Sequence, residues 1–230
     1  MQNRWQANAG VLSNEAMVAI QKSHVLLVGA GGLGGHIANS LVRLGVRRLT
    51  LVDPDVFETS NLNRQLFCAQ STLGQPKAIV VAEALKDIDS DVTVAPYVCR
   101  IEDLDEALWS DVDWVFDAVD KIAVKRWLEQ LAARLEVPLV HGAIGGWYGQ
   151  FAVCMPGCAL LNTFYGNHHE GLERQLGSPT FTPAVVANLM VSEWIKCVTD
   201  HPKKQLNTVF MVDLAHTLMT VLYTMNDEEV

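Results

Sequence analysis

Residues 24–34 read His-Val-Leu-Leu-Val-Gly-Ala-Gly-Gly-Leu-Gly, and this stretch decides the fold. An apolar run typical of a buried strand leads into a glycine-rich turn, and a helical pattern follows from about His36. The glycines are Gly29, Gly31, Gly32 and Gly34. Glycine lets a backbone approach a ligand closely, and the amide groups at the start of a helix favour an anion. The order strand, glycine turn, helix therefore predicts a loop that binds the phosphates of a nucleotide.

An acidic residue stands at the matching place after the next strand. Asp53 closes the apolar run 49–52 and is followed by Pro54 and Asp55. A carboxylate at the tip of that strand is placed to accept a ribose hydroxyl. The alternative is a tight turn in an α/β protein with an acidic residue capping a helix. The pattern favours a nucleotide but does not say which one.

Composition narrows the class of protein. Half of the 230 residues are hydrophobic and 19% are charged, which suits one domain with a substantial core. The net charge of −9 argues against a general binder of nucleic acids or anionic membranes. We find no signal peptide and no apolar run long enough to span a bilayer. The five cysteines form no Cys-x-x-Cys pair. We expect a reduced, soluble, cytoplasmic protein.

The pattern of elements predicts an α/β fold with a Rossmann-like, mostly parallel, doubly wound sheet, helices on both faces and late C-terminal strands. Four parts are expected in a single domain: a helical arm at 1–23, a nucleotide-binding core at 24–158, a crossover loop at 159–182, and a C-terminal helix with strands at 183–230. Helices are expected at 13–22, 36–44, 104–109, 123–135 and 182–198. Strands are expected at 25–28, 49–52, 91–99, 114–120, within 137–153 and within 208–223.

Polar residues after the second strand are candidates for phosphate contacts. The loop 60–65 is rich in amides and includes Asn61 and Arg64, whose guanidinium matches phosphate geometry. The same loop could instead be solvated, with Ser60 or Asn61 capping a turn of helix. Pro76 is expected to open a helix at its first position, which puts Lys77 in the first turn. A cation is disfavoured there unless it faces an anion; an exposed, solvent-screened lysine is the alternative.

Carboxylates follow the apolar run 114–120. Asp120 is placed to hold Mg²⁺ at the carboxyl end of a strand, although it could equally cap the helix that follows. His141, at another strand end, is more simply structural than catalytic. The pair His168-His169 lacks other metal ligands around it, so we do not expect a metal site there. The segment 162–182 is expected to be a loop of low order.

Taken together, these pieces resemble the MoeB, ThiF and HesA family, relatives of ubiquitin-activating enzymes. The motifs that carry the resemblance are Gly29-Ala-Gly-Gly-Leu-Gly34, Asp53-Pro-Asp55, Ser60-Asn-Leu-Asn-Arg-Gln65, Gly74-Gln-Pro-Lys77, Asp117-Ala-Val-Asp120 and the segment 142–150. The resemblance implies ATP-dependent adenylation of the C-terminal Gly-Gly carboxylate of a small ubiquitin-fold sulfur carrier protein, with release of pyrophosphate. The carrier then serves the synthesis of molybdopterin, thiamine or a related cofactor.

The resemblance also implies roles for particular residues. The residues implied to contact ATP are Gly29, Gly31, Gly32, Gly34, Asp53, Asp55, Asn61, Arg64, Gln65 and Lys77. Asp53 would hold the ribose, and Arg64 would reach the phosphates from the partner subunit of a homodimer. Asp120 would bind Mg²⁺, and Arg64, Lys77 and Asp120 would form the catalytic set.

The chain departs from the family pattern in four places. It lacks the paired cysteines of zinc-binding members, so no structural zinc is expected. No cysteine lies in 162–183, where some ThiF proteins carry one for sulfur transfer. Lys121 stands where the family usually has asparagine, and Ala7 leaves one N-terminal arginine, Arg4, where two are common.

Other functions remain open on the sequence. A relative of the same fold could activate a small-molecule or tRNA-attached carboxylate, although the negative net charge counts against tRNA. A nicotinamide-dependent dehydrogenase would explain the glycine loop and Asp53 but leaves Arg64, Lys77 and Asp120 without roles. A non-catalytic ATP-binding scaffold is the remaining alternative.

Overall fold

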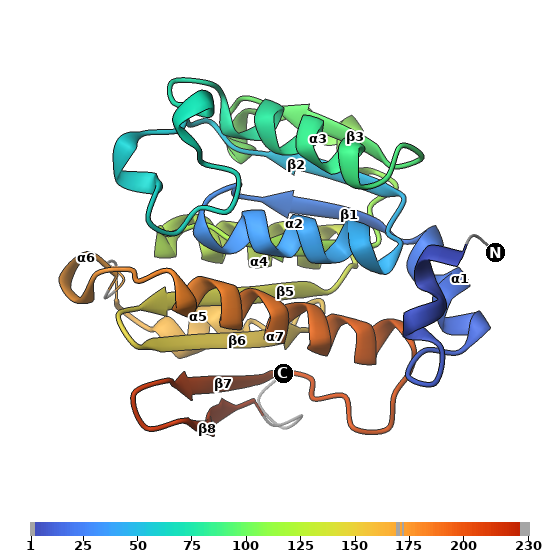
Figure 1. Cartoon of the computed structure of the whole chain (residues 1–230). Coiled ribbons are helices and arrows are strands. Elements are labelled where there is room, and N and C mark those ends of the chain that lie inside the picture. Colours follow the sequence, from blue (N-terminus) through green and yellow to red (C-terminus); the bar gives the residue numbers. More distant parts are fainter. Residues whose placement is uncertain (1–2, 169–170, 172, 226–230) are drawn as a thin grey trace.

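The computed structural model describes residues 3–168, 171 and 173–225, and within them one eight-stranded sheet has the strand order β3-β2-β1-β4-β5-β6-β7-β8 (Figure 1). The strands are β1 (His24–Val28), β2 (Arg48–Val52), β3 (Thr93–Tyr97), β4 (Trp114–Asp117), β5 (Leu139–Gly145), β6 (Tyr148–Cys154), β7 (Thr208–Asp213) and β8 (Leu218–Thr224). The first five strands in the chain pair in parallel, and β6, β7 and β8 continue the sheet in antiparallel pairs. The predicted Rossmann-like sheet with late C-terminal strands is confirmed.

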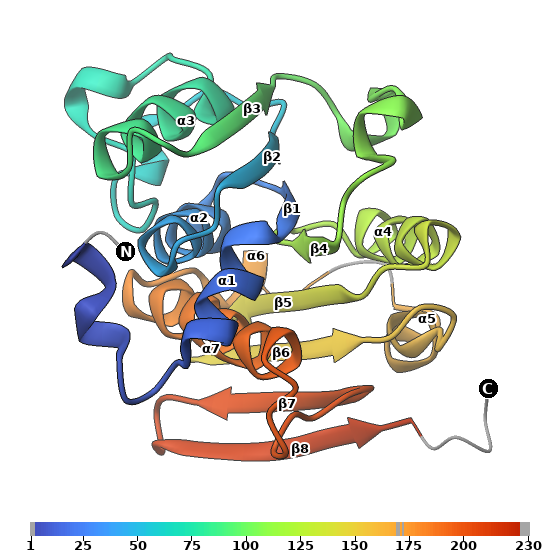
Figure 2. The same cartoon turned by 90° about the vertical axis from the view of Figure 1, so that its right-hand side faces the viewer.

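Helices cover both faces of this sheet. They are α1 (Asn14–Lys22), α2 (Gly32–Leu44), α3 (Lys77–Ile88), α4 (Ile122–Leu135), α5 (Leu160–Tyr165), α6 (Glu173–Leu176) and α7 (Phe181–Val198). Short 3₁₀ turns are η1 (Asn3–Asn8), η2 (Thr59–Asn61), η3 (Gln70–Thr72), η4 (Ile101–Asp103) and η5 (Glu106–Trp109). Figure 2 shows α2, α3 and α7 on one face and α4 and α5 on the other.

The core is split by the sheet because successive side chains of a strand point to opposite faces. In β1, Val25 and Leu27 join the apolar cluster under α2, α3 and α7. Leu26 and Val28 join the second cluster, under α4 and α5. All five residues of β1 are buried, which is the pattern of a central strand covered on both faces. The continuous apolar run at 25–28 is thus typical of a central strand.

Several helix boundaries differ from the predictions. Helix α2 begins at Gly32, earlier than His36, because packing against the sheet holds glycines in a helical turn despite their low propensity. Gly45 ends this helix in a left-handed conformation, as expected. Pro76 precedes α3 as its capping residue, so Lys77 is the first helical residue. Strand β4 ends at Asp117, which leaves Asp120 on the loop before α4. Of the residues expected as a helix at 104–109, only the last four are helical, in the single 3₁₀ turn η5.

The segment 162–182, predicted to be a loop, contains part of α5 and all of α6. Helix α5 has six residues, too few to be stable alone. Two side chains of α4 bond to its ends. Glu129 accepts hydrogen bonds from the amides of Leu161 and Asn162, at 2.6 and 2.9 Å, and Arg126 donates to the carbonyl of Gly166. The sequence prediction failed here because the helix depends on a partner element.

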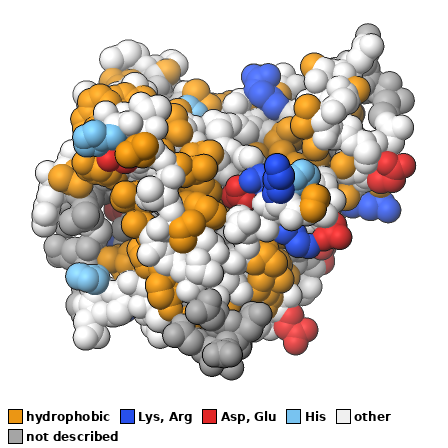
Figure 3. Space-filling model, turned by 90° about the horizontal axis from the view of Figure 1, so that it is seen from below, with side chains coloured by type: hydrophobic (Ala, Val, Ile, Leu, Met, Phe, Trp, Pro, Cys, Tyr) orange, Lys and Arg blue, Asp and Glu red, His pale blue; other side chains and the backbone are white. Residues whose placement is uncertain are grey.

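The sheet ends in an apolar edge. Strand β8 exposes between 44% and 59% of Leu218, Met219, Val221 and Leu222. Figure 3 looks at the molecule from this side, where apolar side chains are prominent. None of the helices in the described part of the chain is both long and apolar enough to cross a membrane.

The first turn of α2 yields a stability prediction. A Cβ at Gly34 would lie 1.8 Å from the carbonyl oxygen of Gly29, whereas one at Gly35 would meet only Phe67 and Leu66, at 3.4 Å or more. Gly34→Ala is therefore expected to lower the free energy of unfolding by about 2 kcal/mol or more. Gly35→Ala, the matched control, should be neutral or stabilising by up to about 1 kcal/mol because alanine favours a helix. Urea denaturation measures both, and equal stabilities would contradict the steric constraint.

Candidate active site

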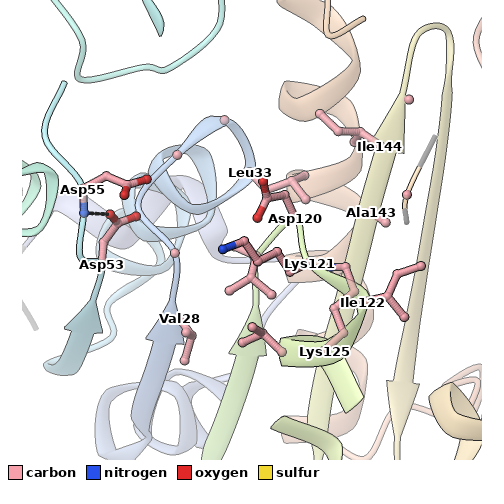
Figure 4. Close-up of a pocket in the computed structure, with 18 of the residues that line it drawn as sticks. Val28, Leu33, Asp53, Asp55, Asp120, Lys121, Ile122, Lys125, Ala143 and Ile144 are labelled. Atoms are coloured by element: carbon pink, nitrogen blue, oxygen red, sulfur yellow. Dashed lines mark hydrogen bonds between the residues drawn. The ribbon is translucent and has the colours of Figure 1, made fainter. Parts of the chain in front are cut away.

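A cavity of about 1270 Å³ opens at the carboxyl ends of the parallel strands. Figure 4 shows Asp53 and Asp55 on one side of the glycine loop, and Asp120, Lys121 and Lys125 on the other. The far wall includes Ala143 and Ile144 of β5. Ligands bind at this edge in open α/β sheets, so the cavity lies where the sequence predicts a nucleotide.

The four glycines of the loop have different positions. Gly29 has φ 99° and lies against the backbone of Ala118, where an added Cβ would be 2.6 Å from the carbonyl oxygen. Gly31 and Gly32 line the cavity with Gly29, so their backbone is open to a ligand. Gly34 does not line the cavity and instead packs against the turn. The predicted contact set thus divides into residues that face the cavity and one that shapes the loop.

Asp53 ties the loop to the end of β2. It is 5% exposed, and its two carboxylate oxygens accept hydrogen bonds from the amides of Ala30 (2.6 Å) and Asp55 (2.8 Å). Burial raises the pKa of the Asp53 carboxyl against these two hydrogen bonds, which lower it. Each carboxylate oxygen keeps a further lone pair. Asp53 can therefore support the loop and still accept a bond from a ligand hydroxyl.

The amides of the loop 60–65 are only partly free. Asn61 is 7% exposed, and its side-chain oxygen accepts the amide hydrogen of Glu58 at 3.1 Å, which matches the alternative of a capped turn. Gln65 is 7% exposed and its Oε1 is buried with no hydrogen-bond partner among the described residues. A buried amide oxygen without a partner is costly. Gln65 is thus the better candidate of the two for a contact with a ligand.

Arg64 belongs to the cavity of its own chain. Its Nη1 donates to the carbonyl of Ser60 (3.1 Å) and to the side chain of Asn63 (3.0 Å). It lines the cavity, and its stem lies beside Gly32. The expectation that Arg64 reaches the phosphates from the partner subunit of a homodimer stays a prediction. Arg64 is half-buried and lines the cavity, so its guanidinium is available to an anion there.

Lys77 does face an anion, and it is a carboxylate of the same chain. The Lys77 side chain is 8% exposed, and its Nζ lies 3.1 Å from Oδ2 of Asp55. Asp55 itself is 66% exposed. This pair explains a lysine in the first turn of a helix, an end that disfavours cations. Asp55 can release Lys77 toward a phosphate because it is well hydrated.

Asp120 is exposed on the loop after β4 and makes no hydrogen bond with any residue that the structure describes. Lys121, not Asp120, occupies the capping position of α4, and its side chain makes no capping bond. The alternative capping role for Asp120 is therefore wrong. Among the described residues, no three His, Cys, Asp or Glu side chains gather as a metal site. A cation at Asp120 would need its other ligands from a substrate and water.

A buried polar cluster that the sequence analysis missed lies beside the cavity. Asp117, with 0% exposure, is bonded to Lys125 and to His141. Tyr165 and Gln150 extend the cluster to the cavity wall. Burial raises the pKa of Asp117, but Lys125 and His141 outweigh it and hold that pKa below its usual range. The structural interpretation of His141 agrees with this bonding.

The cluster was invisible in the sequence because a lysine on an amphipathic helix is usually exposed. The only local signal is that Lys125 is eight residues from Asp117, across a strand end and a helix start. The pair His168-His169 is not supported as a metal site: His168 is exposed and His169 lies outside the described residues.

The sequence of this chain matches a known protein family and several of its members. The ThiF family model matches residues 4–228. The molybdopterin-synthase adenylyltransferase of Escherichia coli is 32% identical over 202 residues, which cover 85% of this chain and 80% of that protein. The SAMP-activating enzyme E1 of Haloferax volcanii is 35% identical over 143 residues, 62% of this chain and 53% of that protein.

Some relatives are much longer. A NEDD8-activating enzyme E1 catalytic subunit from Dictyostelium discoideum is 34% identical over 145 residues, and the match covers 57% of this chain and only 33% of that protein. Of the solved structures, E. coli MccB with succinimide has a TM-score of 0.80 at 20% identity, covering 98% of this chain and 72% of that one. E. coli MccB with ATP has a TM-score of 0.76 at 18% identity, covering 92% and 66%.

The family match spans nearly the whole chain, and the solved structures share its fold. The resemblance seen in the motifs is thereby confirmed, and the chain belongs to the ThiF family.

Proposed function

We propose that this protein is an adenylyltransferase that uses ATP to activate the C-terminal Gly-Gly carboxylate of a small ubiquitin-fold sulfur carrier, releasing pyrophosphate. One observation carries the proposal. Arg64, Lys77 and Asp120 come from three separate segments and line one cavity with the glycine loop. The names of the molybdopterin-synthase and SAMP-activating relatives supply the reaction class and the kind of substrate.

The residues of the cavity fit ATP. The backbone at Gly31 and Gly32 is open to the cavity, and the first amides of α2 favour a phosphate. Asp53 would accept a ribose hydroxyl while keeping its bonds to the loop. The unpartnered Oε1 of Gln65 can accept a hydrogen bond from a ligand hydroxyl. The side-chain NH₂ groups of Gln65 and Asn61 can donate hydrogen bonds to phosphate oxygens.

Asp120 fits a bound Mg²⁺. This cation keeps several waters and is usually held by one or two carboxylates together with substrate phosphates. Asp120 is an exposed carboxylate on the cavity wall, free of bonds to described residues. When bound, Mg²⁺ would neutralise charge on the phosphates.

In the reaction, a carboxylate oxygen of the carrier forms a bond to the α-phosphorus of ATP. The bond from that phosphorus to the bridging oxygen breaks, and its electron pair leaves with pyrophosphate. No proton needs to move, so this step calls for alignment and charge neutralisation rather than for acid–base catalysis. Arg64 and Lys77 provide the positive charge. Lys77 leaves its ion pair with Asp55 and binds a phosphate of ATP instead.

Sulfur transfer without a protein thiol is the simplest continuation of this proposal. Cys99 lines the cavity, but burial raises the pKa of its thiol, and Asp103 raises it further. The thiolate is the nucleophilic form of cysteine, so Cys99 is a poor acceptor of the acyl group. We propose that the acyl-adenylate is passed on to a separate sulfur donor in molybdopterin or thiamine synthesis.

The protein partner is proposed to be the carrier, and the active form a homodimer. Exposed apolar patches mark interaction surfaces, and the edge strand β8 supplies one beside the cavity, since Leu222 contributes to both. Size-exclusion chromatography with light scattering tests the dimer.

Mg²⁺-dependent ATP–pyrophosphate exchange tests the reaction. It is run with and without each small protein of the same genome that ends in Gly-Gly. Exchange that depends on one carrier supports the proposal and identifies the partner. Exchange without any carrier points to a small-molecule carboxylate. ATP binding with no exchange under any condition favours a non-catalytic scaffold.

Arg64→Ala is expected to reduce carrier-dependent exchange by roughly 100- to 1000-fold, the usual loss when one donor to a developing negative charge is removed. The fold should be unchanged because Arg64 is only half-buried and its side-chain hydrogen bonds stay within its loop. Arg43→Ala, which changes an exposed arginine on α2 outside the cavity, is the control. Near-normal exchange in the Arg64 variant would remove that residue from the site.

Asp120→Ala is expected to abolish Mg²⁺-dependent exchange without affecting dimerisation, because the chain then offers the cation no carboxylate at that position. Asp87→Ala, an exposed aspartate on α3, should behave as wild type. A magnesium titration of exchange measures both variants. An unchanged titration curve for Asp120→Ala would show that the metal binds elsewhere.

A further inference from the structure

The buried cluster beside the cavity is a continuous chain of hydrogen bonds. Nζ of Lys125 lies 3.2 Å from each oxygen of Asp117, and Nδ1 of His141 lies 2.7 Å from Oδ2 of Asp117. The Tyr165 hydroxyl is 3.2 Å from Nε2 of His141. Nε2 of Gln150 is 2.5 Å from that hydroxyl. The chain thus runs from a fully buried ion pair to a residue of the cavity wall.

The direction of every bond in this chain is determined. Ionised Asp117 only accepts, so Nδ1 of His141 must carry a proton. Lys125 already neutralises Asp117, and burial lowers the pKa of His141, so the imidazole is neutral and its Nε2 accepts. The Tyr165 hydroxyl must then donate to His141. Burial also raises the pKa of Tyr165, which keeps that proton in place.

These donor and acceptor roles determine the orientation of the side-chain amide of Gln150. The Tyr165 oxygen, having given its proton to His141, accepts from Nε2 of Gln150. An isolated amide could turn over and exchange its oxygen and nitrogen, but here the reversed amide would place two acceptors together. Oε1 of Gln150 makes no hydrogen bond with a described residue, and Gln150 is half-buried and lines the cavity. The cavity wall therefore presents an acceptor of fixed position.

Helix α5 holds Tyr165 in place. Tyr165 is its last residue, and Glu129 and Arg126, one turn apart on α4, bond to the two ends of the helix. The edge of the Tyr165 ring also packs against His141, with ring centroids 5.8 Å apart. These contacts leave the hydroxyl little freedom to leave Gln150.

Gln150 is distant from the phosphate loop. Strand β6 is three positions from β1 in the sheet, which at the usual strand spacing is about 14 Å. Gln150 pairs with Ala143 of β5, and both line the cavity. In the proposed function this is the end of the cavity that remains for the acyl substrate once ATP occupies the glycine loop.

Resting on the proposed function, we propose that Tyr165 is a positioning residue that holds the Gln150 amide so that its oxygen accepts a backbone N–H from the last residues of the acyl substrate. A fixed acceptor selects a donor. The terminal carboxylate and the phosphates of ATP only accept, and a Gly-Gly end has no side-chain donor. Its peptide N–H groups are therefore the complementary partners for Gln150.

The probe is a short, fluorescently labelled synthetic peptide ending in Gly-Gly, bound in the presence of a non-hydrolysable ATP analogue. Tyr165→Phe keeps the ring and removes the hydroxyl, and it is expected to weaken peptide binding about tenfold, the effect of roughly one hydrogen bond. Affinity for the ATP analogue should not change. Tyr97→Phe, on β3 and outside the cavity, is the control. Fluorescence anisotropy measures the affinity for the peptide, and calorimetry measures the affinity for the ATP analogue.

A double-mutant cycle tests whether Tyr165 acts through Gln150. Gln150→Ala should weaken the peptide at least as much as Tyr165→Phe, and the double variant should be no weaker than Gln150→Ala alone. Peptides methylated in turn at their last two amide nitrogens should bind wild type more weakly. The methyl group that removes the recognised N–H should make little further difference to Gln150→Ala.

Unchanged peptide affinity in Tyr165→Phe, or additive losses in the cycle, would overturn the proposal. So would a wild-type protein that binds the nucleotide but not the peptide. If Tyr165→Phe does not fold, Gln150→Ala with the methylated peptides decides the matter by itself. Peptide binding that follows this pattern without any ATP–pyrophosphate exchange would overturn adenylation and leave the Gln150 assignment standing.

Discussion

The carboxylate of Asp117 is fully buried at the end of the central strand β4, and its neutralisation constrains everything around the cavity. A buried charge left without a partner typically costs about 3–5 kcal/mol. Lys125 of α4 and His141 of β5 meet this requirement, and Asp117 Oδ1 also accepts the amide hydrogen of Val119. One carboxylate thereby holds together the start of α4, the loop that carries Asp120 and the part of β5 around His141.

The two ends of the cavity are suited to different chemical groups. At β1 and β2, glycine backbone, helix amides and the cations Arg64 and Lys77 favour phosphates. At β5 and β6 the wall presents the neutral amide of Gln150. Hydrogen bonds through Tyr165 and His141 to the buried Asp117 set the orientation of this amide. A positive charge attracts any nearby anion, whatever the direction. A single neutral acceptor forms a hydrogen bond only with a donor that is correctly placed. In the proposed function, the end at β1 and β2 therefore provides affinity for the nucleotide, and the end at β5 and β6 provides selectivity for the acyl substrate.

The sequence predicted the elements well where the signal was local. Apolar runs identified β1 and β2, the serine cap at Ser13 identified α1, and the glycine turn identified the loop that leads into α2 at the cavity. The prediction failed for α5, whose six residues are helical because Glu129 and Arg126 bond to its ends. It also failed to place Asp120, because nothing in the run 114–120 shows that pairing with neighbouring strands ends at Asp117.

By itself the sequence determined the fold class, the position of the glycine loop and the family, because strand and turn patterns depend on residues close together in the chain. Only the tertiary structure decided that Arg64 lies against the loop of its own chain, that Lys77 pairs with Asp55, and that Gln150 is linked to Asp117. The physical reason is that a buried polar group must find its partner wherever packing brings one. That partner can lie on any helix, strand or loop, so no spacing in the sequence predicts it.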